Sequence, residues 1–283
     1  MILGEKIELF LVNGSPDSII TAEVANWNGK AIKIPRIEVV DCKRDDIQNA
    51  GVYFLICANS ESDEDSVYIG ESENVHERLL QHLRNPNEED RFYWNTAIVF
   101  TGNDLNKAAI RYVEDRLVTI AKECKRYTVL TKNTYKNTVL KEADRSSMEK
   151  FITYVRLLAN TLGYKVLEPK VGRSSSIEGE QECFFLKTGK EIKAKAIMTT
   201  EGFVLLSGAK LNEKTNIKSL REKFSAFREE HIKSELVKDY ITTDDIVFSS
   251  PSAAADFVLG YSVSGPALWK NKDGISIKEL ESK

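Results

Sequence analysis

Two short hydrophobic segments separated by a polar stretch constrain the fold of this chain more than any other feature. Residues 51–57 (Gly-Val-Tyr-Phe-Leu-Ile-Cys) and residues 66–70 (Ser-Val-Tyr-Ile-Gly) are rich in β-branched and aromatic residues, which favour strands. The acidic stretch 59–65 between them is typical of a solvated hairpin tip. We therefore predict a pair of antiparallel strands, followed by a helix that begins near residue 73.

Alternating strand and helix patterns predict an α+β core over residues 46–142. The expected order is strand 51–58, strand 66–70, helix 73–85, strand 94–101, helix 104–124 and a basic irregular stretch. This order predicts a small antiparallel sheet flanked by helices. Residues 1–45 form an N-terminal β-rich extension, in which strands near 7–12, 19–24 and 31–34 predict a short β-meander docked on the core or preceding it.

The second half of the chain predicts a separate α+β domain. Residues 143–168 contain a connecting helix over 144–163 with Asp144 as its cap, and the Pro-, Gly- and Ser-containing stretch 169–180 is typical of a linker. Within residues 181–283 we expect strands at 182–187, 191–199 and 202–207 and a helix near 217–234. A short helix should begin after Ser250, with Pro251 in its first position, and end at Gly260.

A polar stripe on the helix after the hairpin is the first candidate site. Asn74, Arg78 and His82 are spaced i, i+4, i+8 and share one side of that helix. An arginine suits a phosphate because its planar fork donates two parallel hydrogen bonds. The stripe could equally be an ordinary solvated face. Tyr53 and Tyr68 lie on the two neighbouring strands, where most tyrosines serve only in packing.

Glu114 is the second candidate, because it lies on the flank of an apolar helix stripe. Its one-turn neighbours include Ile110, Leu117 and Val118, and a carboxylate among apolar side chains is costly unless it is paired or binds a metal. The structural alternatives are a snorkelling side chain or a salt bridge with Arg111 or Arg78. Two tyrosines, an arginine, a histidine and a glutamate are together the parts of a phosphodiester-cleaving site.

Residues 51 to about 135 resemble the GIY-YIG nuclease domain. The resemblance rests on Gly-Val-Tyr at 51–53, Tyr-Ile-Gly at 68–70, and the order in which the arginine, histidine and glutamate follow. It implies a Mg²⁺-dependent (or Mn²⁺-dependent) endonuclease that hydrolyses nucleic-acid phosphodiester bonds. The zinc-finger and helix-turn-helix attachments of homing enzymes are absent from this sequence, so they cannot supply specificity here.

The resemblance also implies a role for each site residue. Tyr53 would activate or position the attacking water, and Tyr68 would orient water or phosphate. Arg78 would stabilise charge on the scissile phosphate, and His82 would hydrogen-bond the nucleophile side or the phosphate. Glu114 would be the metal ligand. A phenol needs nearby cationic charge to act as a base at neutral pH, and we expect Arg78 and the metal to supply that charge.

Four further residues are expected to support the site. Gly51 and Gly70 would let the backbone approach closely, and Asn74 is a helix-capping type. The asparagine that ends the motif in many members of the family is matched here by Asn133, with Asn137 as its rival.

Nucleic acid, and specifically DNA, is the expected partner, although the net charge of −3 gives the chain no overall attraction to it. The local exception follows the Glu114 helix, where lysines and an arginine are interleaved with tyrosines; a solvated loop is the alternative. This basic strip comprises Lys122, Lys125, Arg126, Lys132 and Lys136.

Bulk properties predict a cytoplasmic protein. No apolar run is long enough for a membrane span, the start of the chain is not typical of a secretory signal, and the four scattered cysteines indicate reduced thiols. Protein partners are not indicated.

Two alternatives to an active nuclease remain at this point. The first is a catalytically idle nucleic-acid-binding or regulatory protein built on a nuclease fold. The second is a protein-interaction role centred on the C-terminal domain. Residues 248–270 resemble a domain of unknown function that is often appended to GIY-YIG modules, and this resemblance implies no activity.

Overall fold

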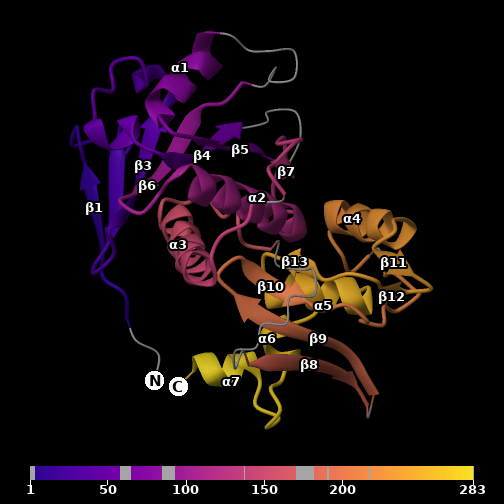
Figure 1. Ribbon diagram of the computed structural model, residues 1–283. Coiled ribbons are helices and arrows are strands. Elements are labelled where there is room, and N and C mark those ends of the chain that lie inside the picture. Colours follow the sequence, from indigo (N-terminus) through magenta and orange to yellow (C-terminus); the bar gives the residue numbers. More distant parts are fainter. Residues whose placement is uncertain are drawn as a thin grey trace. The chain divides into compact units, whose positions relative to one another are not determined.

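The structure is a computed structural model that describes residues 4–57, 65–84, 93–136, 138–169, 182–189, 191–216 and 218–282. The chain divides into two compact units, Met1–Glu168 (unit 1) and Pro169–Lys283 (unit 2) (Figure 1). Each unit combines helices with a largely antiparallel sheet, so the chain is a mixed α/β protein of the expected α+β kind. The described residues contain no helix that is both long enough and apolar enough to cross a bilayer.

Unit 1 is built on a seven-stranded sheet with the order β1-β2-β3-β6-β4-β5-β7. Neighbouring strands are antiparallel, except that β5 and β7 run parallel. The strands are β1 Ile7–Leu11, β2 Ile20–Val24, β3 Gly29–Pro35, β4 Gly51–Cys57, β5 Ser66–Ser72, β6 Thr96–Gly102 and β7 Thr128–Val129. The short β7 lies in the stretch that the sequence predicted to be irregular.

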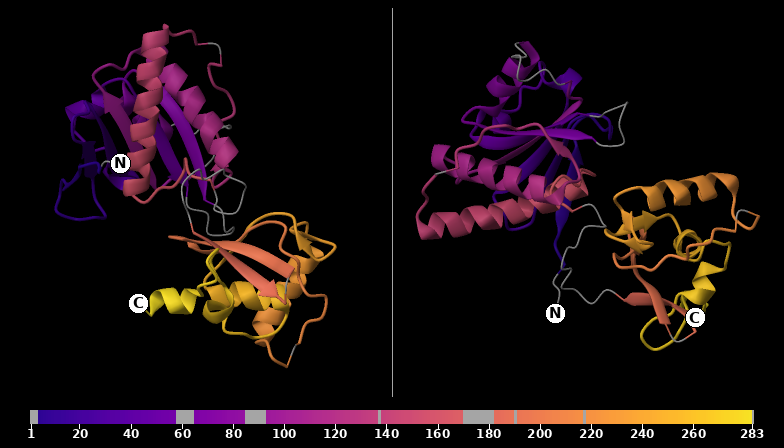
Figure 2. Two further views of the ribbon diagram at one scale, coloured as in Figure 1. Left: turned by 90° about the horizontal axis from the view of Figure 1, so that it is seen from below. Right: turned by 90° about the vertical axis from the view of Figure 1, so that its right-hand side faces the viewer.

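Helices lie on both faces of this sheet. They are α1 Val75–Arg84, α2 Lys107–Cys124 and α3 Glu142–Thr161, with short 3-10 helices at Arg36–Glu38 and Asp45–Gln48. On one face α1 packs Val75 and Leu79 against Leu55 of β4. On the other face α2 and α3 cover residues such as Phe54 and Phe100 (Figure 2). Successive β4 side chains point to opposite faces, and every residue of this strand is buried.

The N-terminal meander is present, and its three strands extend the same sheet. β3 pairs along its whole length with β6, from Gly29 opposite Gly102 to Pro35 opposite Thr96. Ile32 and Ile34 are fully buried, as expected for an interior strand. The short run 31–34 could not reveal this role, because its partner lies more than sixty residues away in the sequence.

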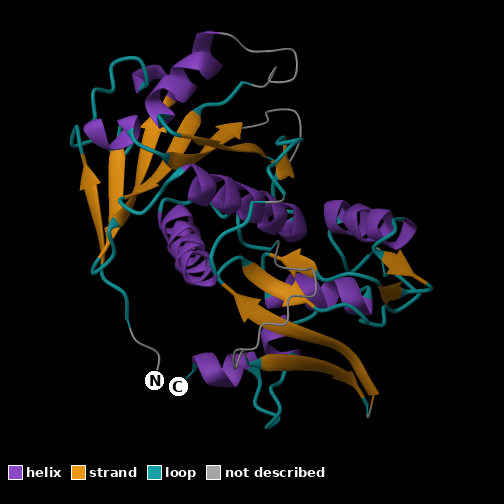
Figure 3. Cartoon of the chain, in the orientation of Figure 1, coloured by secondary structure: helices purple, strands orange, loops and turns teal. Residues whose placement is uncertain are grey.

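Unit 2 contains a four-stranded antiparallel sheet with the order β13-β10-β9-β8 and a two-stranded sheet of β11 and β12 (Figure 3). The strands are β8 Cys183–Thr188, β9 Glu191–Thr199, β10 Gly202–Leu205, β11 Val237–Lys238, β12 Ile241–Thr242 and β13 Ile246–Phe248. The helices are α4 Glu222–Lys233, α5 Pro251–Leu259, α6 Gly265–Leu268 and α7 Ile277–Glu281.

Of two helix N-caps predicted from the sequence, one is present in the structure and the other is not. α5 begins as predicted, with the Ser250 hydroxyl accepting from the Ala253 N–H at 3.2 Å, and ends at Gly260 with φ of 76°. The cap predicted at Asp144 is wrong, because α3 begins at Glu142 after Lys141, without a side-chain cap. Asp144 instead lies in the first turn, where its charge favours the helix dipole.

Candidate active site

Gly70 creates the space in which the first site residue sits. Tyr53 on β4 lies directly opposite Gly70 on β5, so the two residues share a face of the sheet. A Cβ at position 70 would lie 2.5 Å from Tyr53 Oη and 2.6 Å from its Cζ. The phenol therefore extends across β5 only because Gly70 has no side chain. At Gly51 a Cβ would similarly lie 2.6 Å from the Phe100 carbonyl oxygen.

Helix α1 brings His82 to the Tyr53 hydroxyl. Tyr53 Oη and His82 Nε2 are 2.9 Å apart, and both side chains are buried. The ring of Tyr68 lies 5.3 Å from that of His82 and 6.3 Å from that of Tyr53, between centroids. Asn74 caps this helix, because its Oδ1 accepts from the Glu77 N–H at 3.1 Å. The structure thus places both tyrosines and His82 around one point.

Arg78 lies beside the two phenols, one turn before His82. Burial opposes its charge, but interactions with the hydroxyls of Tyr53 and Tyr68 outweigh burial and raise the pKa of Arg78. Burial, assisted by the charge of Arg78, lowers the pKa of His82 to about 4, so this imidazole is neutral at neutral pH. A guanidinium can only donate. The Tyr53 O–H can therefore donate to Nε2 of the neutral His82 in the tautomer that carries its proton on Nδ1.

Within the protein itself, the surroundings of Tyr53 favour its protonated form. The charge of Arg78 lowers its pKa, but burial is the larger effect and raises it above the usual value for a phenol. The expectation that Arg78 would help to make Tyr53 a base at neutral pH is not met by Arg78 alone. Tyr53 is a protonated phenol, and its oxygen accepts a hydrogen bond from the Arg78 guanidinium.

Glu114 lies on α2, on the other face of the sheet. The N-terminus of α2 is set by Asn106, whose Oδ1 accepts from the Ala109 N–H at 3.0 Å. Glu114 is only 6% exposed, and no described residue hydrogen-bonds or ion-pairs with its carboxylate. Neither of the salt bridges considered from the sequence, with Arg111 or Arg78, is therefore present in the described part of the chain.

The environment of Glu114 disfavours its charge. Burial is the main cause and the nearby charge of Glu71 the second, and together they raise the pKa of Glu114 to about 7. Lys107 and Arg111 act in the opposite direction but more weakly. A bound cation would offset this cost.

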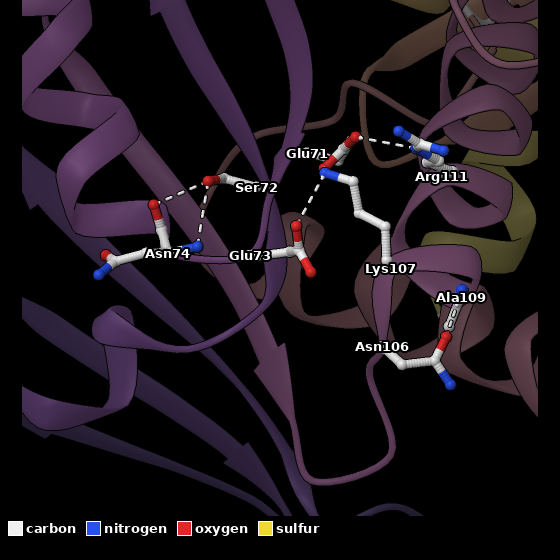
Figure 4. Close-up of polar contacts among 8 residues, drawn as sticks. All are labelled: Glu71, Ser72, Glu73, Asn74, Asn106, Lys107, Ala109 and Arg111. Atoms are coloured by element: carbon white, nitrogen blue, oxygen red, sulfur yellow. Dashed lines mark hydrogen bonds and ion pairs between the residues drawn. The ribbon is translucent and has the colours of Figure 1, made fainter.

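Glu71 is a site residue that the sequence reasoning missed. It follows Gly70 directly, and Figure 4 shows its carboxylate beside Lys107 and Arg111 of α2. Its oxygens lie 3.3 Å from Lys107 Nζ and 3.6 Å from Arg111 Nε. The signal was the alternation of β5, since Val67, Ile69 and Glu71 point to the same side and the first two are buried. A carboxylate continuing a buried row is unusual.

The outer edge of β5 is only partly covered by β7. β7 pairs only with Ser66 and Val67, and farther along the Thr131 hydroxyl donates to the Ile69 carbonyl and accepts from its N–H, at 2.7 and 2.8 Å. Tyr53 lies over Gly70 on the α1 side of the sheet, and Glu114 is buried on the α2 side. Burial is the largest cause of the raised pKa of Tyr53, and the charge of Glu114 adds a smaller effect in the same direction.

The loop after β7 folds over α2 next to Glu114. The Thr134 hydroxyl donates to Asp115 Oδ1 at 2.5 Å, and the Arg111 guanidinium lies 4.0 Å from the centroid of the Tyr135 ring. A groove of about 530 Å³ here is lined by Lys107, Ala108, Arg111, Tyr135, Lys136 and Thr138. Asn133 lies exposed in this loop, whereas its rival Asn137 lies outside the described residues.

The predicted basic strip is divided by the fold. Lys136 lines the groove beside Glu114, and Lys132 is exposed in the same loop. Lys122 and Lys125 lie at the C-terminal end of α2, where Lys122 is about 12 Å along the helix from Glu114. Arg126 Nε donates to the Glu168 carbonyl at 3.0 Å, an interaction within unit 1. The structure thus brings only the loop part of the strip to the site.

The chemistry of the site fits a magnesium ion held through one carboxylate. Among the described residues, no group of three or more His, Cys, Asp or Glu side chains could enclose a metal. Glu114 offers a buried carboxylate without a partner in the described chain, and magnesium is often held by one or two carboxylates, waters and substrate phosphates. Glu114 is the residue that would hold the ion.

Comparison with known families identifies one segment of the chain. Residues 184–281 match the family described as a domain of unknown function, DUF4357. These residues lie in unit 2, in the part of the chain where the sequence indicated such a domain. No curated protein and no solved structure matches the chain.

Replacing Gly70 with Ala is expected to disrupt the site and lower the stability of unit 1. The added methyl would meet the Tyr53 hydroxyl at 2.5 Å and would force the buried phenol away from His82. Overpacking of this kind costs about 1–3 kcal/mol. Thermal unfolding should show the loss, while Gly4→Ala, which meets no atom within 4 Å, should leave the transition unchanged. If Gly70→Ala and Gly4→Ala unfold at the same temperature, the close contact between position 70 and the Tyr53 hydroxyl is contradicted.

Proposed function

We propose that unit 1 is a metal-dependent endonuclease of the GIY-YIG type that hydrolyses nucleic-acid phosphodiester bonds, with DNA as its substrate. One observation supports the proposal: Tyr53, Tyr68, Arg78 and His82 come from three separate elements and lie together on one face of the sheet, while Glu114 is buried on α2 on the other face. A buried carboxylate without a partner in the described chain is costly in a purely structural role, and the guanidinium of the half-buried Arg78 lies beside two phenols. A bound phosphate and cation would give both groups a function.

The nucleophile is a water held by Tyr53. The Tyr53 hydroxyl donates to His82 Nε2, and its oxygen accepts a hydrogen bond from the water. As the water oxygen bonds to phosphorus, the water proton moves to Tyr53 Oη and the phenolic proton moves to His82 Nε2. Because His82 is neutral at neutral pH, its Nε2 can be unprotonated and can accept that proton. Tyr68, packed against His82, orients the water or the phosphate.

Arg78 stabilises the charge that develops on the phosphate. Its guanidinium lies beside Tyr53 and Tyr68, so a phosphate bound there would be adjacent to the nucleophile. Preorganised donors of this kind stabilise a transition state more than the ground state, because the charge on the non-bridging oxygens grows during attack.

The metal would be held by Glu114, and when bound it would supply Lewis-acid stabilisation of the phosphoryl oxygens, worth several kcal/mol. The bond from phosphorus to the leaving oxygen breaks as the water oxygen bonds, and the leaving oxygen takes a proton from solvent. Lys107 and Arg111 hold Glu71, which keeps this second carboxylate adjacent to Glu114. Glu71 thus adds negative charge beside the proposed cation.

A cytoplasmic location suits this activity. None of the four cysteines is in a disulfide, and Cys42, Cys57 and Cys124 are buried thiols, consistent with a reducing compartment.

Cleavage of a substrate panel tests the proposed function. The full chain should cut plasmid, branched or single-stranded DNA in Mg²⁺ or Mn²⁺ and should cut none of them in EDTA. RNA of matched sequence is the control for substrate class. If a folded protein cuts no member of the panel in either metal, the nuclease proposal is contradicted, and retained binding would favour an idle nucleic-acid-binding fold.

A further inference from the structure

The four-stranded sheet of unit 2 has two faces of different character. The inner face carries core residues such as Phe184, Phe203 and Phe248, and Phe203 packs on Trp269. Side chains alternate along each strand, so the intervening residues point the other way. This outer face is formed by Cys183, Phe185, Lys193, Lys195, Ile197, Thr199, Val204 and Val247.

An aromatic ring on the outer face lies between two lysines. Phe185 exchanges both of its backbone hydrogen bonds with Lys270, at 2.7 and 3.1 Å, so these two residues form a hydrogen-bonded antiparallel pair. On its other side Phe185 lies opposite Lys195. That pair is the non-hydrogen-bonded kind, with Cα atoms about 4.5 Å apart. Residues directly opposite share a face, so the row Lys270–Phe185–Lys195 crosses the outer face.

The two lysines of this row have no acidic partners in the described chain. Lys195 and Lys270 are exposed, and neither forms an ion pair with a described residue. By contrast, Lys193 and Lys210 lie 4.0 and 2.7 Å from the same carboxylate, that of Glu191. The charge available to a partner is therefore concentrated on either side of Phe185.

Apolar groups continue from the aromatic ring. In the row next to Phe185, Cys183 lies opposite Ile197, Ile197 opposite Val204, and Val204 opposite Val247. Val247 is 40% exposed, whereas Val204 is fully buried and is not available to a ligand. The outer face thus presents the half-buried ring of Phe185, the exposed Val247, and two lysines without acidic partners among the described residues.

We propose that the outer face of the unit 2 sheet binds single-stranded nucleic acid, with an unpaired base stacked on Phe185 and backbone phosphates on Lys195 and Lys270. Aromatic side chains on a sheet with flanking cations suit a single strand, because every base has a flat face and every nucleotide has a charge. In a duplex the base faces are occupied by neighbouring pairs, so Phe185 would have no stacking partner. This binding is separate from the cleavage proposed for unit 1.

Fluorescence anisotropy with the full chain in EDTA tests the proposal without depending on cleavage. The probes are a short labelled DNA strand, an RNA strand of matched sequence, and the DNA duplex. Phe185→Leu keeps an apolar side chain but removes the flat ring, and it should weaken single-strand binding about 5- to 100-fold. Phe185→Trp should retain binding. The two single strands identify which nucleic acid is preferred.

The dependence of single-strand affinity on salt concentration tests the role of Lys195 and Lys270. Replacing both Lys195 and Lys270 with Ala should reduce the slope of log affinity against log salt by about 1.4, because each phosphate contact on a single strand contributes about 0.7. Lys210→Ala, at an ion-paired lysine, is the matched control and should change the slope less. Both lysines of the double variant are exposed, so this arm remains informative even if Phe185→Leu unfolds unit 2.

Several outcomes would overturn the proposal. They are failure of the wild type to bind either single strand, equal affinity of Phe185→Leu and the wild type, or an unchanged salt slope in the double lysine variant. Equal competition by polyglutamate would indicate a site for acidic protein segments instead. Because binding is measured in EDTA and does not depend on cleavage, a failed nuclease proposal would leave this result unaffected.

Discussion

Glu114→Gln is expected to reduce cleavage about 10³-fold while making the metal-free protein more stable at alkaline pH. The loss of activity follows from the loss of the carboxylate that would hold the cation, since several kcal/mol of metal stabilisation correspond to about this factor. The gain in stability follows from the raised pKa of Glu114, about 7 in the folded chain against 4.5 for an ordinary glutamate. Single-turnover cleavage and thermal unfolding measure the two effects.

The sign of the stability effect depends on pH. The folded pKa is the higher one, so the contribution of Glu114 to stability is fully present below pH 4.5 and is lost as the pH rises through about 7. Above about pH 8 the variant should exceed the wild type by up to ~3 kcal/mol, and below pH 4.5 the two should converge. Added Mg²⁺ should stabilise the wild type only, and this effect should weaken as the pH falls below about 7.

Glu123→Gln is the matched control for Glu114→Gln. It makes the same chemical change on the same helix, at an exposed position. It should alter neither cleavage nor the dependence of stability on pH. Equal stability of Glu114→Gln and the wild type at alkaline pH would contradict the buried, unpartnered carboxylate, whatever the activity of the variant.

Arg78→Lys is expected to lower the rate of cleavage about 10²- to 10³-fold with little effect on substrate binding. The substitution keeps the positive charge but removes the planar fork that can donate two parallel bonds to a phosphate. Loss of one preorganised donor to a developing oxyanion has an effect of this size. Single-turnover rates at saturating enzyme isolate the chemical step, and anisotropy measures binding separately.

Arg84→Lys is the control on the same helix, because Arg84 is exposed at the end of α1. It should cut at the wild-type rate. If Arg78→Lys also cuts at that rate, Arg78 contributes only charge and the proposed contact with the phosphate is wrong. A large loss of binding without a loss in rate would assign Arg78 to substrate capture.

The elements of unit 1 that hold the candidate site were largely predictable from local sequence. β4 and β5 are rich in β-branched and aromatic residues, and α1 follows a capping asparagine, so Tyr53, Tyr68 and Arg78 were placed on the correct elements. The site itself depends on longer-range contacts. The approach of His82 to Tyr53 requires the space at Gly70, which no local propensity reports.

The features that escaped prediction have a common physical cause. β3 and β7 are fixed by pairing with strands distant in sequence, and β7 is only two residues long. Glu71 acquires its importance from ion pairs with α2, which lies more than thirty residues away. The raised pKa of Tyr53 results from burial, and burial is a property of the packed fold rather than of the motif.

Single-turnover cleavage of one labelled DNA substrate by the wild type and Glu114→Gln, with binding measured in parallel, tests the central claim most directly. We predict that the wild type cuts in Mg²⁺ and not in EDTA, and that Glu114→Gln binds the substrate but cuts about 10³-fold more slowly. Equal rates for the two proteins, or cutting by the wild type in EDTA, would show that the group of residues around Tyr53 and Glu114 is not the hydrolytic site.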